Sequence, residues 1–173
     1  MLNLLNVSKQ YAARSNKTQT LAVLNNYSCQ FSAHRECIVG ENGSGKSTLL
    51  LAVSGLLAID NGVIEFNGQE TTQNTRKQRF SIASDSIVIP EFLSANQVLQ
   101  LTSRTWQVAW PAKLIEQFNF TAHIDKTVDA LSAGNLKKLQ IICALMRKSE
   151  LLLLDEPNIA LDEKSVSNFW WGK

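Results

Sequence analysis

The sequence predicts an α/β protein, and two stretches carry most of that prediction. Residues 40–48 read GENGSGKST, which fits the pattern G-x-x-x-x-G-K-[ST]; the strand-like Cys37-Ile38-Val39 precedes them and an apolar helical run follows. Strand, loop and helix together form half of a βαβ unit. Residues 151–154 are four leucines followed by Asp155-Glu156, a pattern typical of a buried parallel strand that delivers carboxylates at its C-terminal edge.

The other elements follow from the spacing of apolar residues. Alternation in residues 2–11 predicts an edge strand, the polar stretch 12–20 a loop, and residues 21–31 a second strand with Tyr27, Cys29 and Phe31 on one face. Further strands are expected at 62–68 and 80–83, and helices at 46–57, 94–104, 111–118 and from Ser132 to Lys148. The basic residues Arg76 and Lys77 are expected on a solvated face.

The glycine-rich stretch has the chemistry of a phosphate cradle. Backbone N–H groups of such a turn and the positive end of the following helix attract anions. We expect Lys46 to reach the outer phosphates of a nucleoside triphosphate and the Ser47 hydroxyl to ligate Mg²⁺. The other residues expected to bind nucleotide here are Gly40, Asn42, Gly43, Ser44, Gly45 and Thr48.

Two later stretches could complete such a site. The stretch Leu131-Ser132-Ala133-Gly134-Asn135 is expected to open a helix with Ser132 as its N-cap, giving a second helix N-terminus able to receive an anion. Asp155 could hold Mg²⁺ through water, and Glu156 could orient or deprotonate an attacking water.

Composition restricts the class of protein. The 173 residues are 45% hydrophobic and 18% charged, which is typical of one globular domain, and the net charge of +2 gives no reason to expect a nucleic-acid partner.

Cys29, Cys37 and Cys143 lie in apolar runs without C-x-x-C spacing, so we expect reduced core cysteines. The N-terminus does not read as a secretory signal, and the longest apolar stretch, 49–59, is too short to span a bilayer. Trp106 and Trp110 are expected to pack within the helical part or, alternatively, to form a docking surface.

Taken together, these motifs resemble the ATP-binding cassette (ABC) family, the nucleotide-binding subunits of ABC transporters. Residues 40–48 resemble Walker A, residues 131–135 the signature LSGGQ, residues 151–157 Walker B with its catalytic glutamate, and residues 160–162 the end of the D-loop. Tyr11 falls where the family carries an aromatic residue that stacks on adenine.

The resemblance implies a RecA-like P-loop NTPase core with a small antiparallel β-layer and an α-helical subdomain. Residues 1–84 and 148–173 would form the core and β-layer, and residues 85–147 the helical subdomain, within one nucleotide-binding domain. It also implies head-to-tail homodimers or heterodimers in which Ser132 and Gly134 of one subunit contact the γ-phosphate held by Lys46 of the other. Transmembrane permease subunits would be partners, and the chain would lie on the cytoplasmic face of the membrane.

The sequence departs from the family pattern at several positions. Ala133 and Asn135 replace a Gly and the Gln of the signature. At the joint before the helical subdomain, the family's Mg²⁺-contacting Gln is replaced by Ser84-Asp85-Ser86, where Asp85 is the best candidate for a substitute metal ligand. No histidine follows His123, so the switch histidine and the last strands of the family are not expected within this sequence, and Phe169, Trp170 and Trp171 would form an apolar end.

Three functions remain open at this level. The leading hypothesis is an ATP-hydrolysing subunit that energises a transporter, with ATP and Mg²⁺ as cofactors. The second is a regulatory cassette that binds ATP but hydrolyses it poorly. The third, a soluble ABC protein of DNA repair or translation, predicts a coiled-coil insertion or a tandem cassette, and the sequence has neither.

Overall fold

The computed structural model describes residues 1–13 and 16–157, without side chains for residues 12–20. The chain forms two compact units, Met1–Phe80 and a second that begins at Ser81.

The first unit contains a four-stranded antiparallel sheet in the order β2-β1-β3-β4. Its strands are β1 (Leu2–Ala13), β2 (Asn16–Phe31), β3 (Asn61–Phe66) and β4 (Gln69–Glu70). Leu4 of β1 lies between Cys29 of β2 and Ile64 of β3, and it is buried as part of the apolar face. The expected small antiparallel layer is therefore confirmed.

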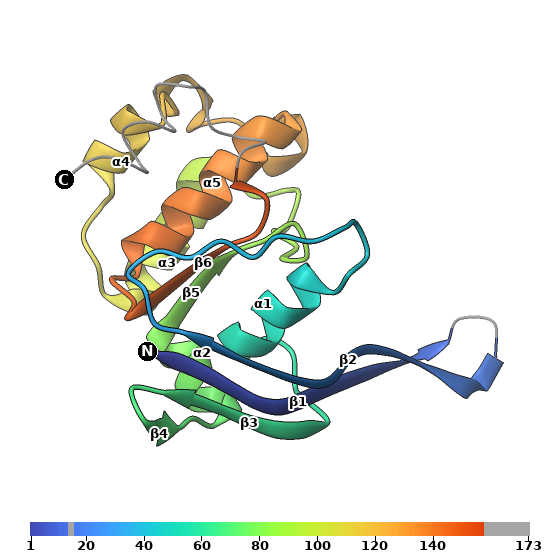
Figure 1. Ribbon diagram of the computed structural model, residues 1–173. Helices are drawn as coiled ribbons and strands as arrows, with labels where there is room; N and C mark the ends of the chain where they lie inside the picture. Colours follow the sequence, from blue (N-terminus) through green and yellow to red (C-terminus); the bar gives the residue numbers. More distant parts are fainter. Residues whose placement is uncertain (14–15, 158–173) are drawn as a thin grey trace. The chain divides into compact units, whose positions relative to one another are not determined.

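The hairpin of β1 and β2 is longer than the sequence predicts. Figure 1 shows the two strands extending past β3, whose pairing with β1 stops at Ser8. Residues 12–20, expected as a loop, mostly continue the ladder, with Ala12 opposite Thr20. The prediction failed because a polar composition does not exclude a strand where a neighbouring strand accepts the backbone hydrogen bonds. On β2, Tyr27, Cys29 and Phe31 are all half-buried and share one face, as expected.

Helix α1 (Lys46–Ser54) packs against α2 (Gln73–Arg79) and β2. Gly55 ends α1 in the left-handed conformation, and its carbonyl accepts a 2.8 Å hydrogen bond from Gln73 Nε2. The expectation of a solvated basic face is wrong for Arg76, which is 3% exposed and donates to the Thr71 carbonyl. Burial lowers the pKa of the Arg76 guanidinium. Lys77 is exposed, as expected.

The stretch before the glycine-rich loop corrects one prediction. Residues 36–40 form no strand, and Val39 is 89% exposed. An apolar tripeptide becomes a strand only where a neighbouring strand accepts its backbone hydrogen bonds, and the four-stranded sheet does not include this segment. Cys37 is exposed for the same reason, so the prediction of three core cysteines is wrong at this position.

The second unit is built on helices and a two-stranded sheet of β5 (Phe80–Ala83) and β6 (Leu151–Leu154). Its helices are α3 (Ala95–Trp106), α4 (Ala112–Gln117) and α5 (Ala133–Met146), with short 3₁₀ turns η1 (Thr121–His123) and η2 (Val128–Ala130). All of the strands and helices predicted in this region are present. Helix α5 packs against α3 and β6, and these elements lie side by side in Figure 1.

A single apolar cluster forms the core of the second unit. Its fully buried members include Leu99 of α3, Phe120 before η1, and Leu139, Ile141 and Ile142 of α5. Ser94 starts α3 with a capping box, accepting from Gln97 N while Gln97 Oε1 accepts from Ser94 N. The capping box and the burial of Ala95, the first residue of the helix, both place the start of α3 directly after Ser94.

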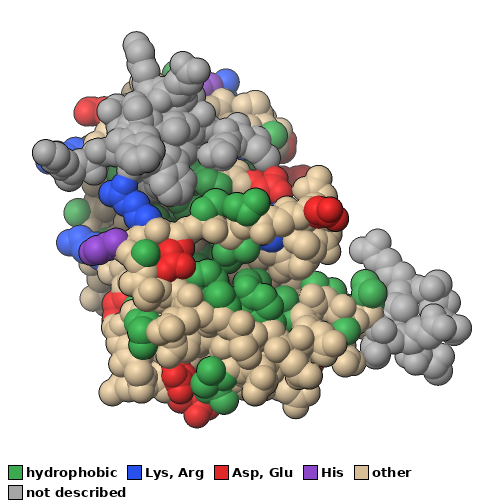
Figure 2. All heavy atoms as spheres, in the orientation of Figure 1, with side chains coloured by type: hydrophobic (Ala, Val, Ile, Leu, Met, Phe, Trp, Pro, Cys, Tyr) green, Lys and Arg blue, Asp and Glu red, His purple; other side chains and the backbone are tan. Residues whose placement is uncertain are grey.

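Surface charge in the described part of the chain is mixed. On the face shown in Figure 2, Lys and Arg side chains lie scattered among Asp and Glu, and neither sign forms a continuous patch among the coloured residues. No helix within residues 1–13 and 16–157 is long and apolar enough to cross a membrane.

Candidate nucleotide-binding site

The glycine-rich loop ends at an uncapped helix. Helix α1 begins at Lys46, and its N-cap is Gly45, which has φ of 93° and no side chain to bond the first-turn amides. Ser44 N donates to Glu41 O at 3.2 Å, which closes the loop just before the helix. Since a helix N-terminus carries N–H groups without intrahelical partners and a partial positive charge, this end of α1 is suited to bind an anion.

The Lys46 side chain lies along the loop. Its Nζ donates to the carbonyls of Gly40 and Glu41, both at 2.8 Å. An ammonium has three N–H donors, and two of them are used by these carbonyls. The positive charge of Lys46 therefore lies at the start of the loop. The geometry agrees with the role expected of Lys46 towards phosphates, which stays a prediction.

Two glycines of the loop have close neighbours at the position that a Cβ would occupy. A Cβ on Gly45 would lie 3.1 Å from both the carbonyl oxygen and Cγ1 of Val23 on β2, and its positive φ also disfavours any side chain. A Cβ on Gly40 would lie 2.9 Å from Ser44 Oγ. Packing of the loop against β2 thus explains Gly45 without reference to a ligand, whereas the close neighbour of Gly40 is a serine side chain of the same loop.

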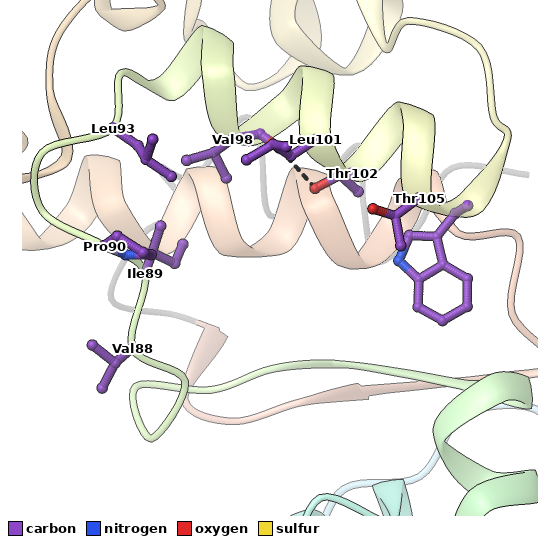
Figure 3. Close-up of a pocket in the computed structure, with 9 residues that line it drawn as sticks. Val88, Ile89, Pro90, Leu93, Val98, Leu101, Thr102 and Thr105 are labelled. Carbon is purple, nitrogen blue, oxygen red and sulfur yellow. Dashed lines mark hydrogen bonds between the residues drawn. The ribbon is translucent and has the colours of Figure 1, made fainter.

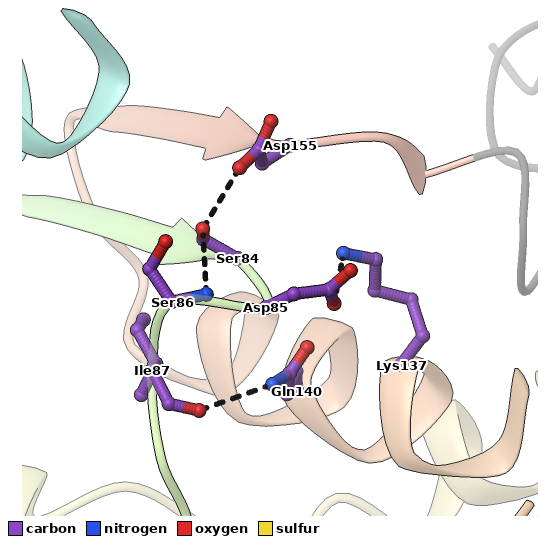
Figure 4. Close-up of polar contacts among 7 residues, drawn as sticks. All are labelled: Ser84, Asp85, Ser86, Ile87, Lys137, Gln140 and Asp155. Atoms are coloured by element: carbon purple, nitrogen blue, oxygen red, sulfur yellow. Dashed lines mark hydrogen bonds and ion pairs between the residues drawn. The ribbon is translucent and has the colours of Figure 1, made fainter. Parts of the chain in front are cut away.

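The carboxylate at the end of β6 lies beside a hydroxyl at the end of β5. Ser84 Oγ donates to Asp155 Oδ2 at 2.8 Å (Figure 4). Asp155 N donates to Ala83 O at 2.9 Å. Asp155 is 8% exposed and Ser84 is fully buried. The two strands run in the same direction in Figure 4, so their C-terminal ends place Ser84 and Asp155 together. This is the arrangement expected for Asp155 at the edge of a parallel pair.

Glu156 follows at once and is exposed. Its φ is 48°, a left-handed conformation that is unfavourable for a residue with a side chain. Strained backbone of this kind is found preferentially at functional sites. An exposed carboxylate directly after β6 fits the role expected of Glu156 towards water, which stays a prediction.

The joint residue Asp85 has a partner that the sequence did not indicate. Lys137 Nζ lies 2.7 Å from Asp85 Oδ1, and Lys137 is 2% exposed whereas the Asp85 side chain is 69% exposed. Figure 4 shows Asp85 pointing towards α5 and Ser84 pointing towards β6. Of the polar residues at the joint, the structure therefore brings Ser84 to Asp155 and brings Asp85 to Lys137. Asp85 as a metal ligand remains a prediction.

The signature-like stretch begins a helix, as predicted. Ser132 is the N-cap of α5, and its Oγ accepts from Asn135 N at 3.3 Å. Ser132 is exposed and Gly134 is half-buried. Helix α5 has fourteen residues, and its N-terminal N–H groups are of the kind that bind anions. The contact of Ser132 and Gly134 with a phosphate held by a second subunit stays a prediction.

Several predicted positions lie elsewhere. Tyr11 is on β1, 38% exposed, with Lys9 Nζ 5.8 Å from its ring centroid; its contact with adenine stays a prediction. The expected D-loop at 160–162 and the apolar end at Phe169, Trp170 and Trp171 lie outside the described residues. Lys137 was not predicted as part of the site. It could have been noticed because it is a lysine on the apolar face of a predicted helix.

Oxygen donors of the right kind for Mg²⁺ are present, namely the Ser47 hydroxyl and the Asp155 carboxylate. Within the described residues, no three His, Cys, Asp or Glu side chains gather closely enough to hold a metal by themselves. Mg²⁺ usually keeps several waters and takes only one or two protein oxygens besides those of a substrate phosphate, so the roles of Ser47 and Asp155 stay predictions.

A glycine-rich loop at the head of an uncapped helix, on an α/β fold, defines a P-loop nucleotide-binding protein. A family model described as ABC transporter matches residues 24–158. The uncharacterized ABC transporter ATP-binding protein YhaQ of Bacillus subtilis (strain 168) is 31% identical over 134 residues, which cover 75% of this chain and 45% of the relative. The phosphonates import ATP-binding protein PhnC 1 of Ruegeria sp. (strain TM1040) is 28% identical over 148 residues, 74% of this chain and 58% of the relative.

Solved structures agree with these matches. The putative cobalt transport ATP-binding protein ST1066 superposes with a TM-score of 0.75 at 25% identity, covering 95% of this chain and 62% of that one. The dimeric structure of MJ0796, a bacterial ABC transporter cassette, gives a TM-score of 0.80 at 20% identity over 100% of this chain and 85% of that one, a likeness of fold.

The chain belongs to the ABC transporter family of ATP-binding proteins, and the predicted fold class is confirmed. It spans about half the length of the curated relatives it matches.

Proposed function

We propose that this chain is an ATP-binding and ATP-hydrolysing subunit of an ABC transporter. The observation that carries the proposal is the Lys46 ammonium fastened to the carbonyls of Gly40 and Glu41 at the uncapped start of α1. Positive charge and backbone donors meet at one loop, which is the requirement for holding a triphosphate. Family membership supports adenosine as the nucleoside.

In this proposal each expected site residue has one task. Lys46 and the loop residues Gly40 to Thr48 bind the phosphates, Ser47 ligates Mg²⁺, and Asp155 holds the ion through water. Mg²⁺ supplies charge neutralisation on the phosphate oxygens when bound. Glu156, exposed at the end of β6, orients the water that attacks the γ-phosphate. Tyr11 stacks on adenine.

A second cassette completes the site in the proposed head-to-tail dimer. Ser132 and the Gly134 amide, at the exposed N-terminus of α5, contact the γ-phosphate bound by the other subunit. The solved dimer of the cassette MJ0796 supports a dimeric arrangement in principle. Loss of the γ-phosphate would remove those contacts and open the dimer.

A transmembrane permease subunit is the proposed partner, and an apolar groove in the second unit supports it. The groove has a volume of about 240 Å³ and lies between the segment 88–93 and one face of α3 (Figure 3). Val88 is 87% exposed and Leu101 52% exposed at its edge, and Trp106 contributes to its lining. Exposed apolar side chains around a hollow are a common feature of docking surfaces. The chain would then be peripheral on the cytoplasmic face.

The relatives' names include both import and resistance proteins, for instance a phosphonates import protein and a daunorubicin/doxorubicin resistance protein of Streptomyces peucetius.

A second candidate is a regulatory cassette that binds ATP and hydrolyses it poorly. The observation that favours it is at the joint, where Asp85 is engaged by Lys137 and no glutamine is present. Both candidates bind ATP, so hydrolysis separates them.

The test is steady-state release of phosphate by the purified chain with ATP and Mg²⁺, compared with Glu156→Gln. Loss of the attacking-water residue should lower turnover by about 10² to 10³ fold if the wild type hydrolyses ATP. Equal turnover in the two proteins would exclude hydrolysis by this chain and leave the regulatory cassette. A control at an exposed carboxylate of the second unit, Glu116→Gln, should keep the wild-type rate.

Docking is tested separately by co-purification with an integral membrane protein encoded beside this chain. Leu101→Asp, which places a charge in the groove, should abolish co-purification, whereas Gln100→Asp on the same helix but outside the groove should not. Retention of the membrane protein by Leu101→Asp would contradict the proposed surface.

A further inference from the structure

We propose that the polar side chains of the turn after β5 have separate roles: Ser84 positions the Asp155 carboxylate, and Asp85 is the counter-ion that fastens this turn to α5 through the buried Lys137. The first role rests on the proposed binding of ATP and Mg²⁺, whereas the second does not.

Ser84 has its hydroxyl fixed on both sides. Its Oγ donates to Asp155 Oδ2 at 2.8 Å and accepts from Ser86 N at 3.2 Å, and the residue is fully buried. A hydroxyl has one donor and can rotate, so the N–H of Ser86 directs the O–H towards Asp155. A buried hydrogen bond to a charged acceptor orients that carboxylate more strongly than a neutral one would.

Lys137 needs its partner more than Asp85 does. The lysine is 2% exposed while the Asp85 side chain is 69% exposed, although their charged atoms are 2.7 Å apart. A buried ammonium without a counter-charge is costly, whereas a carboxylate at the surface is solvated by water when its partner is lost. Loss of the pair is therefore more costly for Lys137 than for Asp85. The buried ammonium of Lys137 holds the Asp85 carboxylate in place because it needs a counter-charge.

A second contact joins the same turn to α5. Gln140, one helical turn after Lys137, donates from Nε2 to Ile87 O at 3.3 Å. Lys137 and Gln140 lie three residues apart, so both side chains leave the same face of α5 (Figure 4). Residues 84–87 are thus held to α5 at two points and to the end of β6 at one.

These contacts connect the Asp155 carboxylate to the N-terminal half of α5, both within the second unit. A movement of the turn that carries Ser84 would shift both the Asp155 carboxylate and the N-terminal half of α5, whose N-cap is Ser132. Asp85 faces α5, because its Oδ1 accepts a hydrogen bond from Lys137. In this proposal Asp85 fixes the position of the turn and does not ligate the metal. Lys137 and Ser84 are accordingly positioning residues.

The Lys137 role is tested by thermal melts of the full nucleotide-free chain. Asp85→Asn leaves the buried ammonium without a counter-charge and should lower Tm by roughly 5 °C. Lys137→Met removes the buried charge and should lower Tm by less than about 2 °C, and the double variant should recover most of the loss caused by Asp85→Asn. A larger loss from Lys137→Met than from Asp85→Asn, or additive losses in the double variant, would overturn this role.

The Ser84 role is tested by titrating Mg²⁺ into each variant in the presence of a fluorescent ATP analogue, N-methylanthraniloyl-ATP. Ser84→Ala should raise the Mg²⁺ concentration for half-maximal signal by about tenfold, the effect expected from removing a group that orients a metal-binding carboxylate. Asp85→Asn should change it by less than about twofold, because the exposed residue acts on the turn and not on the ion.

The opposite pattern, with Asp85→Asn raising the Mg²⁺ requirement tenfold and Ser84→Ala leaving it unchanged, would overturn the proposal and make Asp85 the metal ligand. If the wild-type chain gives no nucleotide signal at all, the proposed function has failed, and the melts still decide whether Lys137 and Asp85 form the predicted pair.

Discussion

Gly55 is the C-cap of α1, the helix that follows the glycine-rich loop. The loss of stability caused by its substitution can be calculated from the structure. The residue has φ of 81°, and a Cβ there would lie 2.5 Å from the carbonyl oxygen of Gln73 and 3.1 Å from Cβ of Arg76. A left-handed conformation costs a residue with a side chain about 1 kcal/mol. Displacing the backbone of α2 to relieve the clash adds about 2 kcal/mol, as in overpacked cores. Gly55→Ala should therefore destabilise the chain by about 3 kcal/mol.

Gly68 offers a matched control within the same unit. Its φ is 76°, yet an added Cβ would meet nothing within 4 Å. Gly68→Ala should cost only the conformational part, about 1 kcal/mol, and both variants gain the same stabilisation from a stiffer unfolded chain. Urea unfolding followed by far-UV circular dichroism measures both free energies. A difference between the variants of less than about 0.5 kcal/mol would refute the steric argument and the packing of α1 against α2 that it rests on.

Three further predictions concern single side chains. Burial raises the pKa of Cys143 to about 11, so its thiol should stay protonated and resist iodoacetamide at pH 8, whereas the exposed Cys37 reacts; mass spectrometry of the peptides checks this, and equal labelling would contradict it. The hydrogen bond from Lys9 lowers the pKa of Asp60 below its usual 3.8, so the pair's stabilisation is present above that value and is lost as pH falls through the lowered folded-state pKa. Asp60→Asn should flatten the dependence of stability on pH in this acid range, and an unchanged profile would argue against the pair. Ser132→Ala removes the N-cap of α5 and should cost about 1 kcal/mol in urea unfolding, while Ser132→Asp should retain most of the stability.

Local patterns predicted most elements because those elements satisfy their own hydrogen bonds or caps. The start of α3 at a capping box and the start of α5 at Ser132 could be located from the sequence, since both caps use residues within three positions. The four leucines of β6 were recognisable because an unbroken apolar run followed by acids has few alternatives.

The elements that failed depend on partners far away in the chain. The apolar residues 37–39 looked like a strand, but a strand needs a neighbour, and no ladder forms there. The polar residues 12–20 looked like a loop, yet pairing between β1 and β2 continues through most of them. Arg76 looked solvated because composition does not show that the Thr71 carbonyl lies within reach of its guanidinium.

The candidate site divides in the same way. The phosphate loop is a contiguous motif, and its helix, its positive-φ glycine and its lysine are where the sequence places them. The joint is assembled from β5, β6 and α5, so the partners of Ser84 and Asp85 could not be assigned from spacing. Only the folded chain shows which of the two polar residues faces the carboxylate.

The central claim is that residues 40–48 bind the phosphates of ATP, and fluorescence titration with N-methylanthraniloyl-ATP in the presence of Mg²⁺ tests it most directly. The wild-type chain should bind the analogue saturably, and Lys46→Ala should weaken binding by at least about tenfold, because it removes the positive charge that lies at the loop carbonyls. Lys113→Ala, at an exposed lysine on α4, should bind like the wild type. Equal binding by the wild type and Lys46→Ala, or no binding by either, would contradict the account.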